Sequence, residues 1–180
     1  MALLQSGTKP SKILVLTDFY PVGLQETFVT PTLETTSSFF DHVTIIPTNL
    51  ESEVEGGMRK VPENVTILLE TWKKARESWS KLSTFSKLSL SLPYIFSSFT
   101  ERYKYSTPIS ESLGEAAYAR HFSKYIQTAI DIKEYQAISA YWLNRPASIA
   151  SELKRRHPHL RFISRAHRGD TVSYTHLTLP

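Results

Sequence analysis

The stretch that decides the fold is Lys12–Thr17, which reads Lys-Ile-Leu-Val-Leu-Thr and continues directly into Asp-Phe-Tyr-Pro-Val-Gly at 18–23. A short, unbroken apolar run of this kind is typical of a strand covered on both faces, as in a parallel sheet. The proline and glycine that follow predict a loop at the carboxyl end of the strand. The first regular element is therefore predicted to be a buried strand that ends in a loop.

Predicted strands and helices alternate along the rest of the chain. This order implies crossover connections and a mostly parallel sheet with helices on both faces. We therefore expect an α/β fold, a Rossmann-like three-layer domain with about six strands. The helix that begins near Glu26 tolerates Pro31 only in its first turn, and Asn144 is a candidate helix cap. Further strands are expected at 42–46, 64–69, 137–143 and 160–164, and helices at 26–40, 113–132 and 146–157.

The segment Trp72–Phe99 carries apolar residues at steps of three and four, which predicts helix. Pro93 is expected to break or kink it. Lysines and an arginine stand among the apolar residues, and two interpretations remain open. The segment is either an interfacial helix that contacts anionic lipid or an ordinary amphipathic helix packed on its own sheet.

Composition narrows the classes of function. The chain has 180 residues, a formal net charge of +4 and no cysteine. Its length suits one domain, and the lack of cysteine excludes disulfides and cysteine-ligated metals. The positive charge is too small to indicate nucleic acid. The scattered histidines suggest no zinc site. The chain has no apolar run of membrane-spanning length, and its first residues lack the apolar core of a signal peptide. Together with the lack of cysteine, this leads us to expect a cytoplasmic location.

Two parts of the chain resemble a known family. The first is Ile13–Pro21 followed by Gly23–Phe28, which reads Gly-Leu-Gln-Glu-Thr-Phe, together with a later strand that ends in Ile-Ile-Pro at 45–47. The second is Tyr141–Leu143 and the string Phe-Ile-Ser-Arg-Ala-His at 162–167. Both are similar to the N-terminal domain of bacterial family-four glycosyltransferases. These are retaining enzymes of GT-B architecture, in which two Rossmann-like domains face each other across a cleft.

The resemblance implies transfer of a sugar from a nucleotide-sugar donor to a sugar or lipid-linked hydroxyl acceptor, in cell-surface polysaccharide synthesis and with no metal. It also implies contact with the inner face of the membrane. The family's donor-binding domain would follow Asp170 and lies outside this chain, so we expect residues 1–170 to be the acceptor-side domain and to be inactive alone. Ser173–Pro180 is similar to a translated sequencing adapter, and 171–180 is expected to be a non-native tail.

The resemblance also implies the site residues. His167 corresponds to a cleft histidine that contacts the donor sugar, although a loop histidine can equally bond a backbone carbonyl. Arg165 either binds phosphate or braces its loop by pairing with Asp170, which is itself either a ligand or a turn former. Gly23 provides an unusual backbone conformation, with or without a ligand close by. Glu26 either caps the following helix or binds an acceptor hydroxyl.

The sequence departs from the family's pattern at two positions. Gln25 stands where the family often has a second glycine, and its side chain narrows the approach of a phosphate to the loop. Arg168 stands where a glycine is common.

Two other functions remain open for this chain. The first rival function is a free-standing Rossmann-like module that binds a nucleotide or a partner. The second is a peripheral membrane protein that works through Trp72–Phe99.

Overall fold

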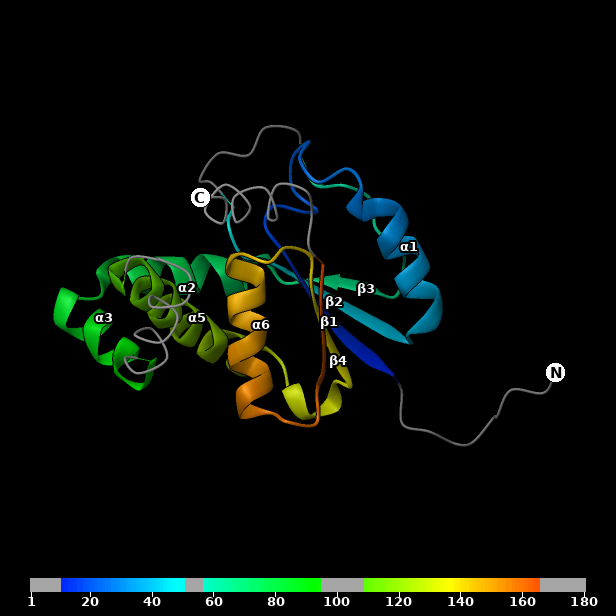
Figure 1. Cartoon of the computed structure of the whole chain (residues 1–180). Helices are drawn as coiled ribbons and strands as arrows, with labels where there is room; N and C mark the ends of the chain where they lie inside the picture. Colours follow the sequence, from blue (N-terminus) through cyan, green and yellow to red (C-terminus); the bar gives the residue numbers. More distant parts are fainter. Residues whose placement is uncertain (1–10, 51–56, 95–108, 166–180) are drawn as a thin grey trace, which may run out of the picture.

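The computed structural model describes residues 11–50, 57–94 and 109–165. Within these residues the fold is α/β, and five parallel strands form one sheet in the order β3-β2-β1-β4-β5 (Figure 1). This confirms the expected Rossmann-like architecture, with one strand fewer among the described residues than the expected six. The strands are β1 Lys12–Thr17, β2 His42–Pro47, β3 Val65–Ile67, β4 Ala137–Ala140 and β5 Arg161–Ser164.

Strand β1 lies at the centre because its residues alternate between two cores. Leu14 and Leu16 belong to one buried cluster, whereas Ile13 and Val15 belong to the other. Side chains point to opposite faces at successive strand positions, so an unbroken apolar run suits only a strand covered on both faces. This is the physical reason that the sequence of β1 predicted the layered fold.

Helices cover both faces of the sheet (Figure 1). Helix α1, Val29–Phe39, buries Val29 and Leu33 against Ile13 and Val15. Three helices contribute to the cluster on the opposite face, which contains Leu14 and Leu16. These helices are α2 Leu69–Lys81, α5 Ile109–Ala129 and α6 Arg145–Arg156.

The predicted helix boundaries need two corrections. Helix α1 begins at Val29 rather than Glu26, which puts Pro31 in its first turn as its missing N–H requires. The helical stretch after Trp72 breaks earlier than Pro93, because Ser83 Oγ accepts a hydrogen bond from Ser86 N at 3.2 Å and starts a new helix. That helix is α3, Thr84–Ser91, and Pro93 lies in the single turn η1, Leu92–Tyr94. A further turn, η2, spans Ile132–Glu134 before β4.

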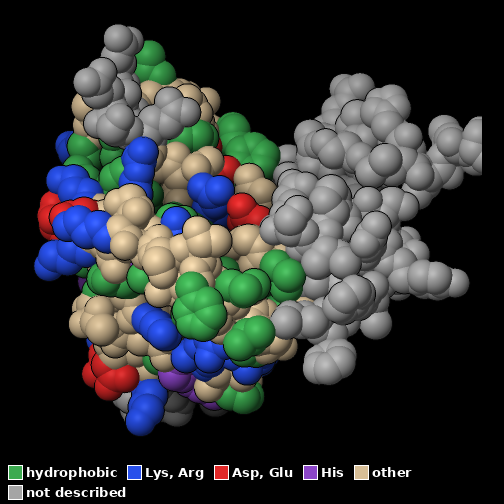
Figure 2. Space-filling view, turned by 90° about the vertical axis from the view of Figure 1, so that its left-hand side faces the viewer, with side chains coloured by type: hydrophobic (Ala, Val, Ile, Leu, Met, Phe, Trp, Pro, Cys, Tyr) green, Lys and Arg blue, Asp and Glu red, His purple; other side chains and the backbone are tan. Residues whose placement is uncertain are grey.

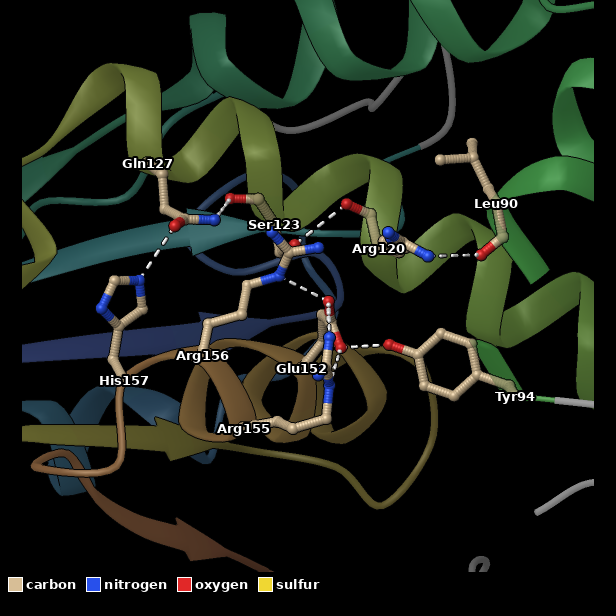
Figure 3. Close-up of polar contacts among 9 residues, drawn as sticks. All are labelled: Leu90, Tyr94, Arg120, Ser123, Gln127, Glu152, Arg155, Arg156 and His157. Atoms are coloured by element: carbon tan, nitrogen blue, oxygen red, sulfur yellow. Dashed lines mark hydrogen bonds and ion pairs between the residues drawn. The ribbon is translucent and has the colours of Figure 1, made fainter. Parts of the chain in front are cut away.

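A buried carboxylate fixes helix α6 against η1 (Figure 3). The side chain of Glu152 is 2% exposed and accepts hydrogen bonds from Arg155 Nε at 2.8 Å, Arg156 Nε at 2.5 Å and the Tyr94 hydroxyl. Burial alone would raise the pKa of Glu152, but the bonds from Arg155, Tyr94 and Arg156 outweigh it and lower the pKa to about 2. The carboxylate therefore stays charged at neutral pH and ties α6 to a distant part of the chain.

Several expectations lie outside the described residues. They concern His167, Asp170, Arg168, the tail at 171–180 and the end of the Trp72–Phe99 segment beyond Tyr94.

Candidate functional site

The candidate site lies where the strand order reverses. The chain moves outward from β1 through β2 to β3, then crosses to the other side of β1 and forms β4 and β5. In open parallel sheets, ligands bind beyond the carboxyl ends of the strands at this switch point. Here it is bordered by the loop 18–28 after β1 and the loop 141–144 after β4, at the upper end of the sheet in Figure 1.

Glu26 organises the loop after β1. It has a φ of 57°, its side chain points back into the loop, and the residue is 6% exposed. Its carboxylate accepts hydrogen bonds from three backbone N–H groups, of Asp18 at 3.3 Å, Phe19 at 2.7 Å and Tyr20 at 2.5 Å, and from the Trp142 indole. The helix-capping interpretation of Glu26 is therefore wrong, because α1 has no side-chain cap and no acidic residue in its first turn. The carboxylate instead joins the two loops of the switch point.

Gly23 has the backbone conformation expected of it. Its φ is 73°, in the left-handed region that favours glycine. Its N–H donates to Gly57 O at 2.9 Å, and its carbonyl accepts from Arg59 Nε at 3.0 Å. Arg59 also donates to Gln25 O at 2.6 Å, so one guanidinium holds both ends of this turn. The conformational role of Gly23 is confirmed, whereas contact with a ligand stays a prediction.

Asp18 is the residue that sequence reasoning missed. It follows β1 directly and is 6% exposed, and its Oδ2 accepts from Asn144 Nδ2 at 2.9 Å. Its Oδ1 is buried without a hydrogen-bond partner among the described residues. Burial raises the pKa of Asp18, with a further contribution from the charge of Glu26, while hydrogen bonding by Asn144 and by the nearby Thr48 hydroxyl and the charge of Arg145 oppose the rise. A buried carboxyl at a switch point is a candidate ligand-binding group.

Arg165 braces the end of β5 against the rest of the domain. Its Nη1 lies 3.1 Å from Thr32 Oγ1 and 3.3 Å from Tyr141 Oη, and its guanidinium lies 5.1 Å from the centre of the Tyr141 ring. The bracing role of Arg165 is thus present, through α1 and the loop after β4. Its expected pairing with Asp170, like the position of His167, falls outside the described residues.

A cavity of about 260 Å³ lies beside the switch point, at the carboxyl end of β2. No sequence motif indicated it, because its walls come from four separate segments of the chain. It is lined by Thr48, Asn49, Leu50, Trp72, Arg76, Trp79, Tyr118 and Arg145.

Other classes of site find no support in the described part of the chain. Across 11–50, 57–94 and 109–165, no three His, Asp or Glu side chains gather as they would around a metal ion. Among the helices of these same residues, none combines the length and apolar character needed to cross a bilayer. No protein-family model matches the chain, and no curated protein matches it either.

Proposed function

We propose that this chain forms the acceptor side of a glycosyltransferase that uses a nucleotide-sugar donor. The observation that carries the proposal is Asp18, a buried carboxyl at the switch point whose Oδ1 is left without a partner among the described residues. A sugar hydroxyl is a chemical match for this oxygen, because it can donate a hydrogen bond or accept one. The family-like string at 13–28 and the described part of the second string, 162–165, border this same edge of the sheet.

The geometry argues against the rival in which the loop after β1 holds a nucleotide diphosphate. In Rossmann-like folds such a group is bound by the loop's backbone N–H groups and the following helix N-terminus. Here the N–H groups of Phe19 and Tyr20 already donate to the carboxylate of Glu26. An incoming phosphate would have to displace this internal anion, so the donor is expected to bind mainly to another domain.

A specific surface favours membrane contact as a second role. Phe85, Leu88 and Leu92 are 80%, 52% and 54% exposed, and their spacing places them on one face of α3 and η1. Figure 2 shows hydrophobic side chains gathered beside Lys and Arg side chains on the side of the molecule that carries α3. By contrast, Trp72 is buried and Trp79 packs edge-on against the Tyr118 ring.

The two interpretations of the central segment therefore apply to different parts of it. The α2 part packs against the sheet as an ordinary amphipathic helix, while α3 carries the proposed lipid contact. Sedimentation with vesicles of anionic lipid tests this role. Phe85→Ser and Leu88→Ser should each reduce the bound fraction, and unchanged binding would contradict the proposal.

The transferase proposal is tested with the protein expressed from its complete reading frame. Acceptor-dependent release of nucleoside diphosphate is measured over a panel of uridine and guanosine diphosphate sugars and hydroxyl acceptors. We expect release with one donor class. A folded protein that releases none across the panel would contradict the proposed function.

A further inference from the structure

The cavity at the end of β2 combines cationic and aromatic walls. The rings of Trp72, Trp79 and Tyr118, from α2 and α5, form its apolar side. Arg76 and Arg145 bring two guanidinium groups to the same space. Small-ligand sites have this composition, with mostly aromatic or apolar walls and a few placed polar groups.

Both guanidinium groups are held in place. Arg145 donates to Asn49 Oδ1 at 2.8 Å and to Glu115 Oε1 at 3.2 Å, and it lies 4.7 Å from the centre of the Tyr118 ring. Its Nε is buried without a hydrogen-bond partner among the described residues. Arg76 donates to Leu50 O at 2.8 Å and has no ion pair with a described carboxylate. The cavity thus holds positive charge that, among the described carboxylates, only Glu115 neutralises, by its pairing with Arg145.

The volume of the cavity limits the size of the anion that it can hold. At about 260 Å³ it falls below the range of roughly 300–1,000 Å³ that is usual for sites of drug-sized ligands. A nucleotide sugar, with a base, two phosphates and two sugar rings, is too large for it. A single sugar ring with one anionic group is small enough, and planar guanidinium groups suit phosphate and carboxylate alike.

We propose that this cavity binds an anionic monosaccharide unit, a single sugar ring that carries a phosphate or a carboxylate. The anionic group meets Arg76 and Arg145, and the ring lies against the aromatic wall. The cavity adjoins the switch point, because Asn49 N donates to Asp18 O at 2.9 Å and Asn144, which binds Asp18, precedes Arg145. A sugar held in the cavity therefore lies next to residues that bind Asp18.

The role of this cavity as the subsite that selects a charged acceptor rests on the proposed function. As a binding site, it stands independently, and it is tested on the present chain without any transfer reaction. Calorimetric titration uses four probes, namely glucose 6-phosphate, glucuronate, glucose and inorganic phosphate. The two test variants are Arg76→Gln and Arg145→Gln. Arg76 is the safer choice, because its side chain is exposed and makes one hydrogen bond. The matched control is Lys74→Gln, on the exposed face of α2.

We expect saturable binding of glucose 6-phosphate or glucuronate, and the comparison of the two shows whether phosphate or carboxylate is preferred. Glucose and inorganic phosphate should each bind at least ~10-fold more weakly, because each offers only half of the contacts. Loss of one charge-assisted hydrogen bond should lower affinity by at least ~10-fold in Arg76→Gln, while Lys74→Gln should bind as the parent does.

Three results would overturn the inference. The first is that neither anionic sugar binds saturably. The second is that glucose or inorganic phosphate binds as tightly as the anionic sugars. The third is that Arg76→Gln and Lys74→Gln change the affinity equally. If Arg145→Gln fails to fold, the affinity of Arg76→Gln still tests the inference. Binding without any transfer by the complete protein would keep this site and remove the proposed function, so the two failures are distinguishable.

Discussion

Replacement of Glu152 by glutamine should destabilise the domain in a pH-dependent way. The carboxylate is buried and accepts from Arg155, Arg156 and Tyr94, which lowers its pKa from the ordinary 4.5 to about 2. The difference between these two pKa values corresponds to roughly 3 kcal/mol of stability at neutral pH. Arg155 is 56% exposed, so solvent screens its share and the measured loss should be about 2–3 kcal/mol.

The sign of the pH dependence follows from the lowered pKa. A group whose pKa falls on folding stabilises the folded state fully above the unfolded value, and this contribution disappears as pH falls through the folded value. The cost of Glu152→Gln should therefore be largest at pH 7, shrink below about pH 4.5 and vanish near pH 2.

Urea denaturation of the parent and of Glu152→Gln at pH 7, 5, 4 and 3 measures this cost. The matched control is Glu77→Gln, which removes a carboxylate paired with Lys81 where both side chains are largely exposed. It should have almost no effect at any pH. A cost for Glu152→Gln that is absent at pH 7, or that stays the same at every pH, would refute this reasoning.

Three further predictions concern Glu26, His167 and the binding of nucleotide sugars. Glu26→Gln should lower the free energy of unfolding by roughly 2–3 kcal/mol in urea melts, because a carboxylate that accepts from three backbone N–H groups and an indole is lost. An unchanged midpoint would count against this prediction. In the proposed glycosyltransferase, His167→Ala should reduce kcat/KM by at least ~100-fold if the side chain stabilises the transition state by ~3 kcal/mol, and near-normal turnover in a folded variant would remove this assignment. Calorimetry of the present chain with uridine and guanosine diphosphate sugars should show weak binding or none, and micromolar affinity would mean that the donor site is misplaced.

The fold could be predicted from the sequence because its signals are local. The apolar run of β1, the alternation of strands with helices and the place of Pro31 each depend on neighbouring residues alone. Periodicity could not locate the break at Ser83, because the apolar spacing continues across it while a single capping hydroxyl starts the next helix. Pro93 is the stronger sequence signal, yet it marks only a later turn.

The candidate site could be predicted only in outline. The switch point follows from topology, and Gly23 follows from its turn. The role of Glu26 did not follow, because its partners include Trp142, which is 116 positions away. The importance of Asp18 likewise depends on Asn144, which is 126 positions away. Contacts of such long sequence separation leave no periodic pattern.

The central claim is that sugar transfer takes place at the switch point beside Asp18. The most direct test compares kcat/KM of the complete protein with that of Asp18→Asn, which keeps the size of the side chain and an oxygen that can accept from Asn144. The control is Asp131→Asn, an exposed carboxylate in the connection that leads into the amino end of β4. Loss of a hydroxyl contact made in the transition state predicts a fall of roughly 30- to 100-fold for Asp18→Asn and none for Asp131→Asn. Parent-like turnover in a folded Asp18→Asn variant would contradict the claim.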